Sequence, residues 1–220
     1  MTSRRDFLAT LGAALGATSL AGCARNLQAA STRRSLERVG IQLYTVRSVL
    51  AKDFEGTIAT IAGIGYKEVE FANYFGRTPA QVRAVLQANG LTSPATHIEF
   101  PKDEDAWQRT LDNAKEIGHE WVVIPWLDAA MRKTPDDWKR VADRYNRLGM
   151  LARTAGLRFA YHNHAFELAR FPDGSTGLDT LLARTDRELV DFEMDIYWVV
   201  KGEADPMDFI TRYPGRFSLM

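Results

Sequence analysis

The sequence predicts an α/β fold: a parallel (β/α)8 barrel of the TIM type, with about six and a half of its units present. From Val39 onward, short apolar runs alternate with longer amphipathic runs, which is typical of parallel strands joined by helical crossovers. Four of the amphipathic runs end at a glycine, and an apolar strand follows each of these glycines. No glycine-rich phosphate-binding motif follows the first strand, which argues against a dinucleotide-binding sheet.

The individual elements follow from apolar periodicity and from the glycines and prolines at their ends. The predicted strands are Val39–Tyr44, Lys67–Phe71, Leu91–His97, Trp121–Pro125, Arg158–Tyr161 and Leu189–Met194, with a seventh beginning at Arg216. The predicted helices are Phe54–Ile64, Pro79–Asn89, Asp105–Ile117, Pro135–Ala155, Leu178–Arg184 and Asp205–Tyr213. A full barrel has eight strands in about 250 residues. We therefore expect the sequence to be incomplete at its C-terminal end, by about two strands.

The first 23 residues predict an export signal. Residues 3–8 (SRRDFL) resemble the twin-arginine motif, and an apolar stretch too short for a confident membrane span follows. Residues 20–23 (LAGC) match the bacterial lipobox, which makes Cys23 the predicted lipidation site. An ordinary signal peptide with an incidental cysteine is the alternative. We expect 24–37 to be a tether, 38–220 to be the partial barrel, and the protein to be periplasmic and held at a membrane by lipid.

The charge of the protein restricts its partners. It carries 28 basic and 28 acidic residues, so its formal net charge is zero, and the basic residues are scattered. A binding role driven by a basic surface is therefore not expected, and we predict no nucleic-acid partner.

The functional groups of a parallel barrel lie at the carboxyl ends of its strands. The sequence places polar and aromatic residues there, and their mixture of imidazole and carboxylate suits one divalent metal, such as Mn²⁺, Zn²⁺, Co²⁺ or Mg²⁺. The predicted metal ligands are His164, Glu167 and Asp195; the predicted proton-transfer residues are Glu167, Glu70 and His162; the predicted substrate contacts are Gln42, Tyr44, His97, Trp126 and Trp198. Each has an alternative role as a hydrogen-bonded core residue or as part of the barrel rim.

Four phrases carry a resemblance to a known family: GIQLYTVR at 40–47, GYKEVEFA at 65–72, YHNHAFEL at 161–168 and FEMDIYWVVKGEADP at 192–206. Together they resemble the sugar phosphate isomerase/epimerase family, whose fold is the xylose-isomerase-like TIM barrel. The resemblance runs from about Val39 to the end of the sequence.

The resemblance implies one divalent metal held by Glu, Asp, His and Glu from four strands. Asp195 matches the family's aspartate on strand six, but the glutamate of strand five has no clear counterpart. His162, His164 or Glu167 must replace that glutamate. Trp198 stands where ketose epimerases tend to have a substrate-binding histidine.

The activity that the resemblance implies is proton abstraction next to a carbonyl. We expect a metal-dependent isomerase, epimerase or lyase that acts on a sugar, keto-sugar or polyol. One alternative is a non-catalytic sugar-binding lipoprotein on the same barrel. A phosphodiesterase is a third reading, but the zero net charge and the four histidines argue against it.

Overall fold

The structure is a computed structural model that describes residues 39–220. The predicted signal sequence, the lipid site at Cys23 and the tether lie outside the described residues. Within residues 39–220, no helix is both long enough and apolar enough to cross a bilayer.

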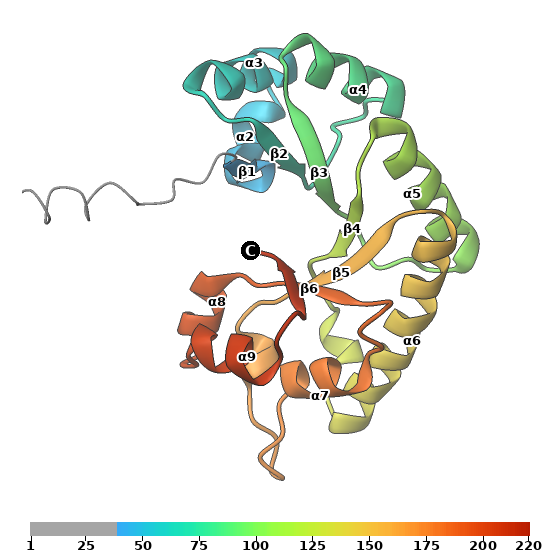
Figure 1. Cartoon of the computed structure of the whole chain (residues 1–220), viewed down its shortest axis with the longest axis vertical. Helices are drawn as coiled ribbons and strands as arrows, with labels where there is room; N and C mark the ends of the chain where they lie inside the picture. The colour runs from blue at the N-terminus through green and yellow to red at the C-terminus, as the bar shows by residue number, and fades with distance from the viewer. Residues whose placement is uncertain (1–38) are drawn as a thin grey trace, which may run out of the picture. The chain divides into compact units, whose positions relative to one another are not determined.

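Residues 39–220 build one sheet of seven strands in sequence order, and every neighbouring pair is parallel (Figure 1). The strands are β1 Gly40–Gln42, β2 Glu68–Phe71, β3 Thr92–His97, β4 Trp121–Ile124, β5 Arg158–His162, β6 Asp191–Glu193 and β7 Phe217–Leu219. This arrangement confirms the predicted fold class, a (β/α)8 barrel of which part is present.

Helices connect successive strands, and Figure 1 shows α3 to α7 following one another along the outside of the curved sheet. The helices are α2 Arg47–Leu50, α3 Phe54–Ile64, α4 Pro79–Ala88, α5 Glu104–Ile117, α6 Pro135–Thr154, α7 Gly177–Arg184, α8 Ile196–Lys201 and α9 Pro206–Arg212. Short 3-10 helices occur at Leu43–Val46, Ala129–Met131 and Phe166–Leu168, labelled η1, η2 and η3. Helices α2 and α8 were not predicted from the sequence, because helices of four and six residues are too short to show periodicity.

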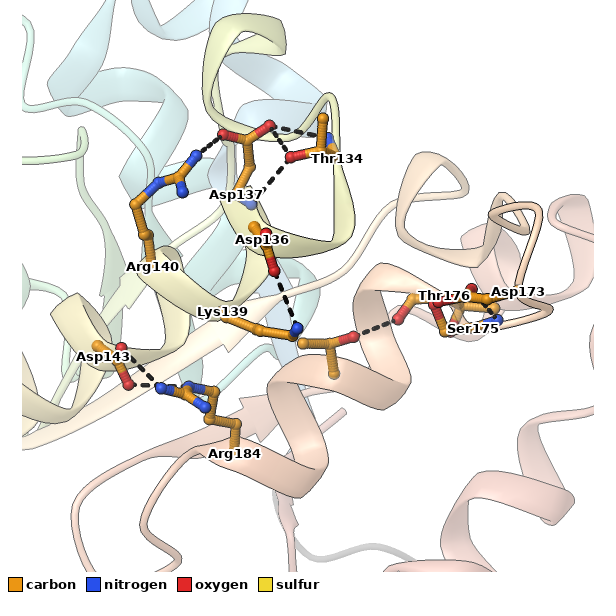
Figure 2. Close-up of polar contacts among 11 residues, drawn as sticks. Thr134, Asp136, Asp137, Lys139, Arg140, Asp143, Asp173, Ser175, Thr176 and Arg184 are labelled. Atoms are coloured by element: carbon orange, nitrogen blue, oxygen red, sulfur yellow. Dashed lines mark hydrogen bonds and ion pairs between the residues drawn. The ribbon is translucent and has the colours of Figure 1, made fainter.

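Side-chain caps fix where the outer helices begin. In α6, the Thr134 hydroxyl accepts from the Asp137 backbone N–H, and the Asp137 carboxylate accepts from the Thr134 backbone N–H, which is a capping box (Figure 2). Farther along α6, Asp143 forms a bidentate ion pair with Arg184 of α7, with N···O distances of 2.9 and 3.0 Å (Figure 2). This pair links two consecutive helices of the outer layer.

Two departures from regular strands lie close to the polar ends. The pairing of β2 with β3 shifts register between Glu68 and Glu70. The pairing of β6 with β7 shifts between Phe192 and Glu193. Such irregularities change the direction in which a neighbouring side chain points.

The first strand is shorter than predicted. The Gln42 side-chain oxygen accepts a hydrogen bond from the Tyr44 backbone N–H at 2.7 Å, and η1 begins at Leu43. Tyr44 therefore lies beyond the strand in which the apolar pattern placed it. This local turn could not be predicted from that pattern, because Leu43 is buried as a strand residue would be.

Candidate active site

Three side chains from three strands converge at the carboxyl ends of the sheet. His97 ends β3, His162 ends β5 and Glu193 ends β6. His97 Nε2 lies 3.0 Å from one Glu193 oxygen, and His162 Nδ1 lies 3.6 Å from the other. The two imidazole rings are 4.9 Å apart, centre to centre. We call His97, His162 and Glu193 the polar cluster.

Glu70, at the carboxyl end of β2, borders the polar cluster. Its Oε1 lies 3.4 Å from His97 Nε2. Burial and the nearby charge of Glu193 raise the pKa of Glu70 to about 9. Burial acts in the same direction on Glu193, but the imidazoles of His162 and His97 outweigh it and hold the pKa of that carboxyl well below its usual range. Without a cation, the two carboxyls therefore differ: Glu70 keeps its proton and Glu193 is ionised.

The polar cluster suits a metal ion. One ligand atom from each of His97, His162 and Glu193 lies within 4.8 Å of the other two. Glu70 Oε1 and His162 Nδ1 are buried and have no hydrogen-bond partner among residues 39–220. Buried polar atoms without partners are rare, and a cation bound to the lone pair of His162 Nδ1 would remove that cost for the imidazole. Two imidazoles and a carboxylate are ligands that Mn²⁺, Zn²⁺ and Co²⁺ accept.

Asp195 borders the polar cluster on the other side. Its Oδ2 lies 3.8 Å from His162 Nε2, and its Oδ1 accepts from the Trp198 backbone N–H at 3.0 Å, which caps α8. The Asn163 side chain fixes the Asp195 backbone through hydrogen bonds to its N–H and its carbonyl. The structure thus places Asp195 beside His162, with one carboxylate oxygen engaged in the helix cap.

His164 lies next to His162, with ring centres 5.0 Å apart. Its other neighbours are aromatic rings. Trp126 is 5.2 Å away and edge-on, Trp198 is 5.1 Å away, and Phe166 is stacked at 5.7 Å. Burial, and to a lesser degree the charge of His162, lower the pKa of His164 to about 4. His164 is therefore neutral near pH 7.

Glu167 occupies a different environment from the one predicted for it. It is completely buried; the Tyr161 hydroxyl donates to its Oε1 at 2.5 Å, and the His164 backbone N–H donates to its Oε2 at 2.9 Å. Burial raises the pKa of Glu167 to about 7, although both hydrogen bonds act to lower it. Both carboxylate oxygens thus support the turn after β5, and the structure does not bring Glu167 into the polar cluster.

The remaining predicted residues divide between the site and the rim. Gln42 is register partner to Glu70 in the β1–β2 pair, with a buried amide nitrogen. Tyr44 is 57% exposed, and its ring packs under the Arg47 guanidinium, 3.9 Å from the ring centre. Glu193 was not among the predicted site residues, although it lies one residue before the end of the predicted strand Leu189–Met194. The sequence signal that could have identified Glu193 is a glutamate close to the carboxyl end of a buried parallel strand.

A cavity of about 570 Å³ gives access to this region. Gln42, Glu70, His162, Glu193 and Asp195 are among its lining residues, together with Tyr197 of α8. Volumes of this order accommodate small ligands. The fold and the site together define a parallel β/α barrel protein with a cluster of histidine and carboxylate at the carboxyl ends of its strands.

Comparison with known proteins identifies the family. Residues 58–218 match the family described as xylose isomerase-like TIM barrel, and the chain belongs to that family. The match covers strands β2 to β6 and the first two residues of β7, and with them the whole polar cluster.

Several individual proteins are similar to this chain. Inosose dehydratase from Lacticaseibacillus casei is 25% identical over 185 residues, which cover 75% of this chain and 61% of the relative. The chain thus spans about three fifths of the length of the inosose dehydratases that it matches. A solved sugar phosphate isomerase/epimerase from Parabacteroides distasonis superposes with a TM-score of 0.75 at 26% identity, over 85% of this chain and 75% of that one. L-ribulose 3-epimerase has a TM-score of 0.60 at 16% identity, over 83% and 71%, and shares the fold.

Proposed function

We propose that the protein is a divalent-metal-dependent isomerase, epimerase or dehydratase that acts on a sugar, a keto-sugar or the ketone of a polyol and moves a proton next to its carbonyl. The observation that carries this proposal is the polar cluster of His97, His162 and Glu193 at the carboxyl ends of three parallel strands. The similarity to inosose dehydratases and to a sugar phosphate isomerase/epimerase supports the carbohydrate substrate.

Each residue of the site has a role in this proposal. His97, His162 and Glu193 would hold the metal, and Asp195, with Oδ2 3.8 Å from His162 Nε2, would orient that imidazole from its other side. A divalent metal supplies Lewis acidity, which polarises a carbonyl and stabilises negative charge on its oxygen. Glu70 is buried beside the cluster, with its Oε1 3.4 Å from His97 Nε2, so it would give or take the proton of the reaction.

The experiment is a solvent-exchange assay. Purified protein with Mn²⁺ is incubated in D₂O with keto-sugars and with an inosose, and the proton next to each carbonyl is followed by NMR. We expect metal-dependent loss of that signal for at least one compound, and no loss after treatment with a chelator. Tight sugar binding without exchange or turnover on any compound would instead favour a non-catalytic sugar-binding protein.

We also propose that the protein is exported by the twin-arginine route and held at a membrane by lipid on Cys23. The support is the order of the two motifs in residues 3–8 and 20–23. Cell fractionation followed by mass spectrometry of the mature N-terminus tests this proposal. Replacement of Cys23 by serine should release the protein from the membrane fraction, and an unmodified Cys23 in the mature protein would contradict it.

A further inference from the structure

Asn163 connects the ends of β5 and β6 beyond their last paired residues. The backbone pairing of the two strands ends at His162 and Glu193. The next contact between the two segments comes from the side chain of Asn163. Its Oδ1 accepts from the Asp195 backbone N–H at 3.1 Å, and its Nδ2 donates to the Asp195 carbonyl at 3.3 Å. The Asn163 amide thus pairs with both backbone groups of Asp195, as a strand residue would.

The surroundings of Asn163 show that its side chain serves this connection. The residue is only 1% exposed. Its Nδ2 makes one further and longer contact, 3.5 Å from the carbonyl of His164. The amide oxygen faces a donor and the amide nitrogen faces acceptors, so both ends of the amide have the partners they require. Asn163 therefore acts on its neighbours and not on a ligand.

The fixed backbone of Asp195 also fixes its carboxylate. Oδ1 accepts from the Trp198 backbone N–H at 3.0 Å, which caps α8. The other oxygen, Oδ2, lies 3.8 Å from His162 Nε2. His162 directly precedes Asn163 in the chain, so the two hydrogen bonds of Asn163 join the backbone of the imidazole to the backbone of the carboxylate. Asn163 thereby sets the separation between these two side chains.

This separation concerns the side of His162 that faces away from the polar cluster. His162 Nδ1 lies 3.6 Å from Glu193 inside the cluster, whereas Nε2 lies toward Asp195. An imidazole that binds metal through one nitrogen is almost always oriented by a carboxylate, a carbonyl or water at the other nitrogen. Displacement of such a support by more than about 0.5 Å weakens a site.

We infer that Asn163 is a positioning residue of the candidate active site, whose two hydrogen bonds to the Asp195 backbone place the Asp195 carboxylate against His162 and so orient that imidazole for the metal. This inference rests on the proposed function for the presence of the metal. Asn163 acts through Asp195 and does not itself bind the ion.

The test is calorimetric titration of the full-length protein and its variants with Mn²⁺. Asn163→Leu keeps the size of the side chain and removes both hydrogen bonds. Asp195→Asn keeps an oxygen that can cap α8 but replaces the oxygen that faces His162. We expect Asn163→Leu to weaken Mn²⁺ binding about fivefold to tenfold in the parent protein. In the Asp195→Asn background it should weaken binding less than about twofold, because the orienting carboxylate is already lost.

Asn146→Leu is the matched control. Asn146 of α6 makes the same kind of connection in the outer layer, where its Oδ1 accepts from the Asp186 backbone N–H at 2.7 Å and its Nδ2 donates to the Arg184 carbonyl at 3.3 Å. Both leucine variants should lower the urea midpoint of unfolding, but only Asn163→Leu should weaken Mn²⁺ binding. Asn163→Ser, which is too short to make either bond, replaces the leucine variant if that variant does not fold.

Crystal structures of the metal-free parent and of Asn163→Leu give a measurement that needs no metal. We expect the distance between Asp195 Oδ2 and His162 Nε2 to change by more than about 0.5 Å. An unchanged distance, an unchanged Mn²⁺ affinity, or an equal loss of affinity with and without Asp195→Asn would overturn the inference. A parent protein that binds no Mn²⁺ would refute the proposed metal-dependent function, and the metal-free crystals would still decide whether Asn163 sets the separation.

Discussion

His97 Nε2 and Glu193 Oε2 lie 3.0 Å apart, although 96 positions separate the two residues in the sequence. They come from β3 and β6, which are not neighbours in the sheet. The contact forms because the sheet curves and brings the carboxyl ends of distant strands together. It joins an imidazole to a carboxylate in a largely buried environment, where such a contact is strong.

Glu193→Gln should therefore weaken Mn²⁺ binding at least about tenfold, because the amide keeps the shape of the side chain but not its charge. The measurement is metal content after dialysis, with calorimetric titration of the metal-free protein. Glu99→Gln is the matched control, since Glu99 is an exposed glutamate shortly after β3. Equal losses in both variants would indicate a nonspecific effect of charge and contradict the assignment of Glu193 as a ligand.

Two buried tyrosines provide a test of the hydrogen bond to Glu167. Tyr161 donates to Glu167, while the Tyr145 hydroxyl is buried without a partner in residues 39–220. Tyr161→Phe should lower the free energy of unfolding by about 1 to 3 kcal/mol, because it leaves a buried carboxyl oxygen without its donor. Tyr145→Phe removes an unpartnered hydroxyl and should leave stability unchanged or raise it. Urea denaturation measures both, and equal destabilisation by the two changes would contradict a specific contribution from the Tyr161–Glu167 hydrogen bond.

The pKa of His119 makes stability depend on pH. Burial lowers this pKa to about 4, although a hydrogen bond to the Ser93 carbonyl acts in the opposite direction. In the unfolded protein this histidine has an ordinary pKa of about 6.5. At a pH between 4 and 6.5 the unfolded protein therefore binds more protons than the folded protein. The contribution of His119 to stability should therefore be fully present above pH 6.5 and fall away as the pH drops toward 4. NMR titration of the ring measures the pKa directly, and a value of 6.5 or more would contradict the prediction.

The fold could be predicted largely from the sequence. Gly65, Gly118 and Gly156 adopt the left-handed conformation at or just after the end of a helix, and each precedes an apolar strand, so element order and strand direction follow from local signals. The short helix α8 could not be recognised in this way. Its start depends on the Asp195 side-chain cap, and in the sequence Asp195 reads as the end of a strand.

The composition of the site was less predictable. His162 and Asp195 were placed at strand ends, where they do lie beside each other, because each follows an apolar run. Glu167 was chosen for its closeness in sequence to two histidines, but η3 turns its carboxylate into the core under Tyr161. The importance of Glu193 depends on its distance to His97, a relation set by sheet curvature that no local pattern encodes.

Glu70 and Glu193 each stand where the hydrogen-bond ladder to the next strand shifts by a residue. An irregularity of this kind is a place where one residue can be gained or lost in the neighbouring strand without moving the helices outside. Descendants of this protein could thus redirect either carboxylate by a single insertion or deletion in β3 or β7. A change in the length of β3 or β7 would then alter the substrates that the site accepts, while the outer helices keep their positions.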